Sequence, residues 1–102
     1  MDEQVTAGLD VLAERFRQIE EYGYSFEHDD RQNQNGELVT AAMYYAATDD
    51  LRASLEANGF KLSSFHAQAF DPKDRRSNLV CAAALLVAEI ERLDRLSKRP
   101  RC

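Results

Sequence analysis

The chain has 102 residues, of which 44% are hydrophobic and 30% are charged, with four glycines, two prolines and no tryptophan. This length and balance predict one globular helical domain over residues 1–102, and they exclude a collagen-like, low-complexity or disordered chain. The formal net charge is −5. A net acidic protein repels duplex nucleic acid, so we expect no nucleic-acid partner.

The sequence also indicates the cellular compartment in which we expect the protein. No apolar run approaches the roughly 20 residues that cross a bilayer, and residues 1–4 lack the basic flank and apolar stretch of a signal peptide. Cys81 and Cys102 are too few for a disulfide framework or a four-ligand zinc site. We therefore expect a cytoplasmic protein with no membrane partner, in which Cys81 is a small buried hydrophobe.

Two amphipathic helices are predicted, one near each end, at about residues 3–22 and 72–98. In the first, apolar side chains recur at helical spacing until Gly23 ends the helix. Its apolar positions are Val5, Leu9, Leu12, Phe16 and Ile19. The last helix repeats the spacing at Leu79, Ala83, Leu86, Ile90 and Leu93. Asp71 is its expected N-cap and Pro72 its first residue.

We expect the two terminal helices to supply most of the buried apolar side chains of the domain. The last one would be about 40 Å long at 1.5 Å per residue. One small protomer cannot cover such a helix along its whole length, so we expect a homo-oligomer that assembles through the first and last helices.

Shorter helices are predicted in the middle, at about 37–47 and 50–57. The first of these presents a narrow face of small residues, on which we expect close packing by another helix. Phe60 to Phe70 gives a mixed pattern. This segment fits either a short β segment around 60–66 or an irregular aromatic stretch, and the pattern leaves both open. The expected fold class is all-α.

An acidic run follows the first helix: Glu27, His28, Asp29 and Asp30. Oxygen ligands of this kind suit Mg²⁺ or Mn²⁺, and the metal set would be Glu27, Asp29 and Asp30 with Glu37. The simpler interpretation is a solvated loop whose carboxylates cap backbone amides, and we favour it, so no metal or other cofactor is expected.

An enzymatic alternative is an all-α NTP pyrophosphohydrolase. Such enzymes pair Glu-x-x-Glu on one helix with Glu-x-x-Asp on another, so that facing carboxylates hold Mg²⁺ against a triphosphate. Glu91 and Asp94 match the second half, but Thr40 stands where the first half needs a glutamate after Glu37. The alternative catalytic set is Glu27, Asp30, Glu37, Glu91 and Asp94. Because the motif is broken, we favour no catalytic residue.

The best phosphate candidate is the start of the last helix, where Lys73, Arg75 and Arg76 are followed by Asn78. A helix N-terminus attracts anions, and cations placed there oppose the helix dipole, a conflict that a bound anion relieves. Asn78 would bond a sugar or base. An equally weighted alternative is that the two arginines pair with the acidic run at 27–30.

Aromatic residues gather near the same segments. Tyr45 and Phe16 are expected in the core. One or two of the others would stack on a purine base while the arginines hold its phosphates. The ligand contacts expected beside the basic residues are Tyr24, His28, Tyr44 and Phe70.

Four blocks of the sequence resemble a family of small proteins encoded by phages and prophages. The blocks are Glu14-Arg-Phe-Arg-Gln-Ile, Gly23-Tyr-Ser-Phe-Glu-His-Asp-Asp, Gly36-Glu-Leu with the alanines and tyrosine that follow, and Arg75-Arg-Ser-Asn-Leu-Val through Ala-Glu-Ile-Glu-Arg-Leu-Asp94. In size and layout the chain is similar to phage anti-defence sponges such as the Thoeris anti-defence proteins. The resemblance implies oligomers in the host cytoplasm that sequester cyclic or ADP-ribose-derived signalling nucleotides.

The chain departs from those phage proteins by lacking the tryptophan often found between the middle helix and the basic turn. The implied stacking contact is therefore in doubt. The sequence is therefore compatible with three functions. We favour a binding protein for a small phosphorylated nucleotide. The alternatives are the Mg²⁺-dependent hydrolase and a structural or protein-binding helical module.

Overall fold

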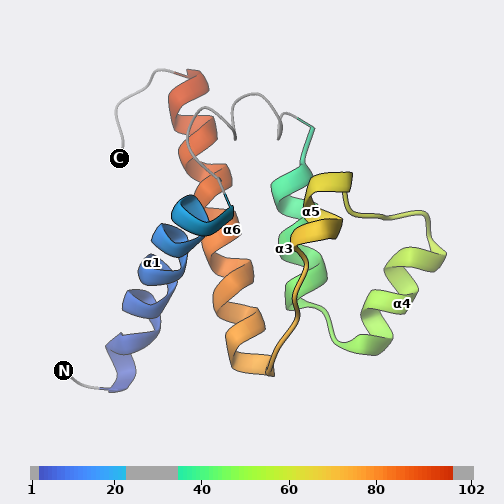
Figure 1. Cartoon of the computed structure of the whole chain (residues 1–102), viewed down its shortest axis with the longest axis horizontal. Helices are drawn as coiled ribbons and strands as arrows, with labels where there is room; N and C mark the ends of the chain where they lie inside the picture. Colours follow the sequence, from blue (N-terminus) through green and yellow to red (C-terminus); the bar gives the residue numbers. More distant parts are fainter. Residues whose placement is uncertain (1–2, 23–34, 98–102) are drawn as a thin grey trace.

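The computed structural model describes residues 3–22 and 35–97 of the chain. These ranges contain helices and no strand, which confirms the all-α class. The helices are α1 (Glu3–Tyr22), α3 (Glu37–Ala46), α4 (Asp49–Ala57), α5 (Ser64–Ala69) and α6 (Arg75–Ser97), as Figure 1 shows. Within the described ranges, no helix combines the length and the apolar character that a membrane span needs.

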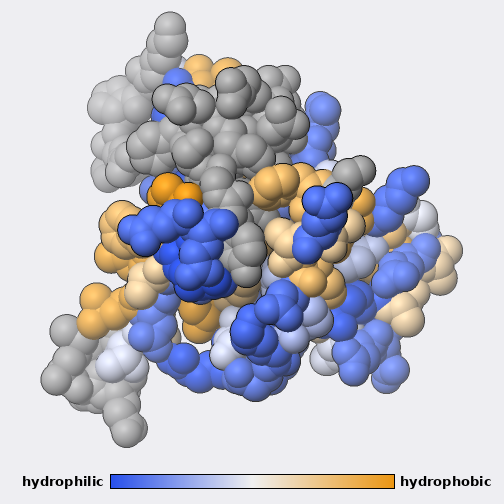
Figure 2. Space-filling view, viewed as in Figure 1, coloured by the Kyte–Doolittle hydropathy of each residue, from blue (hydrophilic) through white to orange (hydrophobic). Residues whose placement is uncertain are grey.

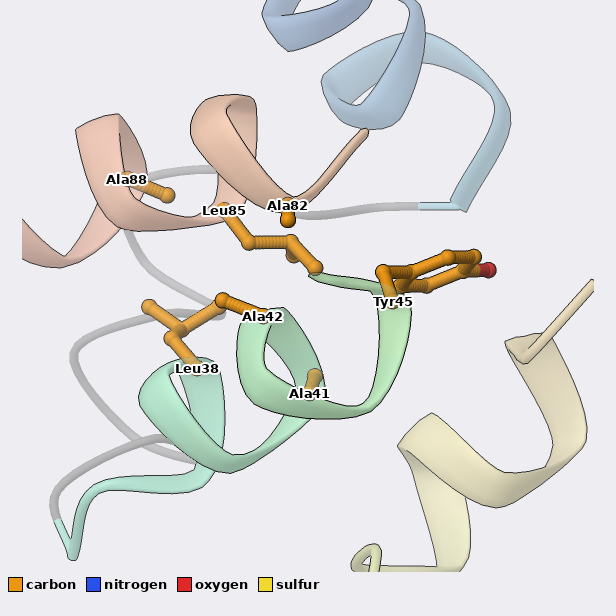
Figure 3. Packing of buried hydrophobic residues seen from close by; sticks show 7 residues of the cluster. All are labelled: Leu38, Ala41, Ala42, Tyr45, Ala82, Leu85 and Ala88. Atoms are coloured by element: carbon orange, nitrogen blue, oxygen red, sulfur yellow. The ribbon is translucent and has the colours of Figure 1, made fainter. Parts of the chain in front are cut away.

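The core lies between α3 and α6. Leu38, Ala42 and Tyr45 of α3 face Leu85 and the alanines of α6 in Figure 3. Ala41, Ala82 and Ala88 complete the buried cluster. Small side chains on both helices let the two backbones approach closely, so leucine and tyrosine fill the remaining space. The predicted packing face of α3 is therefore confirmed.

The segment before α5 contains no β segment. Residues 60–63 have no regular structure, and α5 begins directly after them. The hydroxyl of Ser63 accepts a hydrogen bond from the His66 backbone N–H, which is the usual N-cap contact. The alternative of a strand around 60–66 was therefore wrong, because the capping serine starts a helix where the aromatic alternation suggested an extended chain.

The arrangement of α1 differs from the prediction. Figure 1 shows α1 on one side of α6 and α3, α4 and α5 on the other. The fully buried side chains of α1 are Arg15 and Gln18, whereas Leu9, Leu12 and Phe16 are about half exposed. The expectation that the apolar stripe of this helix forms the buried face was therefore wrong within one protomer, because α1 packs on α6 through polar side chains.

The stripe predicted on the last helix is exposed as well. Leu79, Leu86, Ile90 and Leu93 are each between 43% and 59% exposed. The buried residues of α6 instead follow the neighbouring face: Asn78, Ala82, Ala84, Leu85, Ala88 and Arg92. Alanines, rather than the large apolar residues, therefore face the core.

The last helix begins later than its sequence suggests. It starts at Arg75, and the carboxylate of Asp74 accepts hydrogen bonds from the Ser77 backbone N–H (3.1 Å) and the Ser77 hydroxyl (2.6 Å). Asp74 is thus the N-cap, and the prediction of Asp71 in that role with Pro72 as the first residue was wrong. Residues 71–73 have no regular secondary structure, and the chain turns there into the helix, as Figure 1 shows.

Candidate functional site

A groove lies where α1 meets the first turns of α6. Its inner part is a hollow of about 310 Å³, walled by Glu14 and Arg17 of α1 and Tyr45 of α3. The remaining wall residues are Asp71, Lys73, Ser77, Asn78 and Cys81. An adjoining hollow of about 250 Å³ shares three of these residues and adds Asp10, Ala13, Arg76 and Val80. We call the two hollows together the α1–α6 groove.

Hydrogen bonds fix the turn that forms the floor of this groove. The Asn78 amide donates to the Lys73 carbonyl (3.1 Å) and accepts from the Lys73 backbone N–H (2.6 Å). The Tyr45 hydroxyl accepts from the Asp71 backbone N–H (2.8 Å) and donates to the Ala69 carbonyl (3.3 Å). Asn78 therefore lines the groove, and both ends of its amide hold the turn in place.

The cations at the start of α6 are exposed. Lys73 pairs with Asp71 at 2.8 Å and Arg76 with Asp10 at 2.7 Å, in contacts open to solvent. The exposed guanidinium of Arg75 has no partner among the described residues. Exposed ion pairs contribute only about 0–1 kcal/mol each. A stronger anion can therefore displace Asp71 and Asp10 at small cost.

Two other arginines have a different role. Arg15 is 2% exposed and donates from Nε to Glu91 at 2.9 Å, linking α1 to the far part of α6. Arg92 is also buried and donates two hydrogen bonds to Glu89, at 2.8 and 3.0 Å. Buried pairs of this kind are costly to break because the remaining charge loses its partner. They belong to the scaffold of the domain.

An acidic end closes the inner hollow. Arg17 donates two hydrogen bonds to the Glu14 carboxylate, both at 2.7 Å, and a third to Glu21. Burial alone would raise the pKa of Glu14, but these hydrogen bonds and the charge of Arg17 outweigh it and lower the pKa. Glu14 is therefore an ionised acceptor at neutral pH.

Cys81 lies beside this carboxylate. Its Sγ donates to Glu14 Oε2 at 3.5 Å, and the Gln18 amide nitrogen lies 3.6 Å from the same sulfur. Burial and the charge of Glu14 raise the pKa of Cys81 to about 11. The thiol therefore stays protonated near pH 7 and is a poor nucleophile there. The Gln18 amide oxygen is buried with no partner among the described residues.

Tyr44 and Phe70 lie outside the groove. The Tyr44 hydroxyl donates to the Phe60 carbonyl at 2.7 Å, and its ring meets Phe70 edge to face at 6.1 Å. Phe70 also contacts Tyr45, with ring centroids 4.7 Å apart, and the guanidinium of Arg52 lies over its face. These rings therefore serve packing between α3 and the turn before α6.

Three carboxylates of the enzymatic alternative lie in the described ranges: Glu37, Glu91 and Asp94. Glu37 accepts from the Asn35 backbone N–H at the start of α3, and Glu91 accepts from Arg15. Asp94 lies about one turn beyond Glu91 on α6. No group of three or more potential metal ligands occurs in the described ranges. The other predicted residues lie outside those ranges: Tyr24, Glu27, His28, Asp29 and Asp30.

Glu14, Arg17, Tyr45 and Ser77 were not among the predicted site residues. Glu14 and Arg17 lie on the polar side of α1, which a sequence with an apolar stripe predicts to face solvent. The positioning of α1 depends on contacts such as Gln18 with Cys81, 63 residues apart in the chain. A glutamate and an arginine one turn apart were the available signal, but exposed helix surfaces carry such pairs often.

Comparisons of the chain with protein-family models, curated proteins and solved structures found no match. The similarity to phage-encoded proteins therefore stays a prediction from the sequence blocks quoted above. The geometry of the α1–α6 groove is the basis for the function proposed next.

Proposed function

We propose that the protein binds a small phosphorylated nucleotide in the α1–α6 groove and sequesters it in the cytoplasm. The observation that carries this proposal is the set of exposed cations at the start of α6, beside a hollow of about 310 Å³. Ligand pockets occupy about 300–1,000 Å³, so the inner hollow suits a small ligand, and the adjoining one extends it.

The charges favour phosphate at the outer end of the groove. Arg76 lines the adjoining hollow and is held only by its exposed contact with Asp10. Arg75, the residue before it, is exposed without a partner in the described ranges but lines neither hollow. Guanidinium groups bind phosphate oxygens through paired donors, more strongly than they bind a solvated carboxylate. The Asp74 carboxylate already accepts the Ser77 backbone N–H of the first turn of α6, so phosphate binding there depends on the guanidinium groups and not on free backbone amides.

The inner end suits the sugar of the same ligand. Glu14 is ionised and repels phosphate, but its oxygens accept hydrogen bonds from hydroxyl groups. Tyr45 and Cys81 add an aromatic and a weakly polar wall. A nucleotide with its hydroxyls towards Glu14 and its phosphates towards Arg76, beside which Arg75 lies in the sequence, satisfies both ends. This polarity favours a nucleotide over inorganic phosphate.

Isothermal titration calorimetry tests the proposal with a panel of ADP-ribose, cyclic ADP-ribose, ATP and a cyclic dinucleotide. At least one compound is expected to bind. Arg75→Gln and Arg76→Gln should each weaken it about tenfold, which corresponds to one lost charge-assisted contact. Lys61→Gln is the matched control, because Lys61 is exposed and lines a different hollow.

Three results would contradict the proposal or change its class. If none of the four compounds gives a binding signal, small phosphorylated nucleotides are excluded as the ligand class. An equal loss with Lys61→Gln shows that general charge, rather than the groove, attracts the anion. Recovery of a cleaved ligand after incubation with Mg²⁺ identifies an enzyme, whereas intact ligand agrees with sequestration.

A further inference from the structure

Two rows of large apolar side chains lie on the surface of the protomer. The α1 stripe is Leu9, Leu12 and Phe16, and the α6 stripe is Leu79, Leu86, Ile90 and Leu93. Every member is at least 43% exposed. Apolar (orange) atoms are visible at the outer edge of the molecule over α1 in Figure 2. Contiguous apolar rows of this kind on a small protein mark an interaction surface.

The attachment of α1 makes its stripe harder to explain within one protomer. A surface helix gains most of its stability by burying its apolar face. In α1 that face points away from the body, and the contacts with α6 are made by Glu14, Arg15 and Gln18. The apolar side of the helix therefore requires another surface to be buried.

We propose that this surface is a second copy of the chain, with the α1 stripe of each protomer packed on the α6 stripe of its partner. The two stripes together present on the order of 700 Å² per protomer, close to the roughly 800 Å² per partner of a standard-size interface. Either stripe alone offers about half of that area. A stable dimer therefore needs both stripes, which a two-fold symmetric exchange provides.

Charge favours pairing α1 with α6 over pairing like with like. The sequence of α1 holds five acidic and two basic side chains, whereas that of α6 holds three acidic and four basic ones. Two copies of α1 placed together would repel each other, and α1 placed on α6 brings opposite net charges together. The arrangement forms a closed dimer rather than an open chain of protomers.

The proposed interface is separate from the α1–α6 groove. Glu14 and Arg17 reach into the groove from the side of α1 that meets α6, and the stripe occupies the outer side. Substitutions in the stripe leave Arg75 and Arg76 in place. Assembly and nucleotide binding can therefore fail independently of each other.

Sedimentation velocity over a dilution series tests the proposal with the full chain. The wild type is expected to sediment as a dimer. Leu12→Glu and Ile90→Lys should each raise the dimer dissociation constant about a hundredfold, because each buries an unpaired charge. Leu51→Glu on α4 is the matched control, since Leu51 and Leu12 are exposed to 53% and 51%. Circular dichroism confirms that each variant keeps its helices.

Mixing the two variants tests the pairing itself. In a heterodimer of Leu12→Glu with Ile90→Lys, one contact joins the new glutamate to the new lysine and the other contact is wild type, so the mixture should regain the dimer. A monomeric wild type overturns the proposal. Variants that stay dimeric place the interface elsewhere. Folded variants that are monomeric alone and also when mixed exclude the pairing of α1 with α6.

Discussion

Four of the arginines that the structure describes differ sharply in burial. Arg15 and Arg92 are buried against Glu91 and Glu89. Arg75 and Arg76 lie in solvent at the start of α6. Arg15 therefore links α1 to α6 where water is largely excluded, and Arg92 pairs within α6, whereas the guanidinium groups of Arg75 and Arg76 remain exposed to solvent.

Substitution of the two kinds of arginine should have unequal effects on stability. Arg15→Ala is expected to lower the free energy of unfolding by about 3 kcal/mol, because it removes packing and leaves Glu91 without its partner. Arg76→Ala should cost less than about 1 kcal/mol, since its contact with Asp10 is exposed. Urea denaturation measures both values. Equal decreases in the free energy of unfolding would show that Arg15 does not anchor α1 to α6.

Cys81 should respond to the charge of Glu14. Its pKa of about 11 lies above the ordinary 9.0, so the folded state prefers the thiol. This contribution to stability is complete below about pH 9 and is lost as the pH rises towards 11. Glu14→Gln removes a negative neighbour, which lowers the pKa and should raise the rate of iodoacetamide alkylation at pH 8 about threefold or more.

The alkylation rate is best measured in a Cys102→Ser background, so that Cys81 is the only cysteine that reacts. Arg76→Gln serves as the control, because the causes that shift the pKa of Cys81 do not include Arg76. An unchanged rate in Glu14→Gln would mean that burial alone raises the pKa. In that case the carboxylate is not the charged inner wall of the groove.

At the scale of the helices, the start of α6 is stabilised by one capping aspartate, Asp74. Asp74→Ala is expected to lower the melting temperature by a few degrees, because the Ser77 backbone N–H loses its acceptor. Asp71→Ala should have a smaller effect, since that carboxylate contacts only the exposed Lys73 ammonium. Differential scanning calorimetry compares the melting temperatures of the two variants. A larger decrease for Asp71→Ala would show that Asp71 is the N-cap of α6, as the sequence suggested.

Local sequence signals explain which helices could be predicted and which could not. The existence of α1, α3, α4 and α6 followed from apolar spacing and turn residues, because both are local properties. The six residues of α5 are too few to establish a helical period, so the aromatic spacing around them left a short strand and an irregular stretch both open and did not predict a helix. Helix starts were less certain than helix existence, since Asp71 and Asp74 are both acceptable caps.

At the scale of the whole molecule, the sequence predicted the two stripes and an assembly through the first and last helices, but it wrongly placed the stripes in the buried face of the protomer. Spacing shows that Leu9, Leu12 and Phe16 share a face, yet it cannot show that this face points away from α6. The same limit applies to the groove. Its cations were predicted from the local sequence, whereas the walls from α1 and α3 depend on contacts between distant segments.

The proposed dimer gives α1 two roles. Its inner side supplies Glu14 and Arg17 to the groove, and its outer side carries the α1 stripe. In the proposed dimer, the partner would add apolar packing on the outer side of a helix whose fully buried side chains are Arg15 and Gln18.

The most direct test of the central claim is a nuclear magnetic resonance titration of the ¹⁵N-labelled protein with ADP-ribose and with ATP. Nucleotide binding in the α1–α6 groove predicts amide shifts concentrated at residues 73–78 and 14–17, while Leu51 and Lys61 stay unmoved. Spectra that do not change with either compound, or that change only away from the groove, would contradict it.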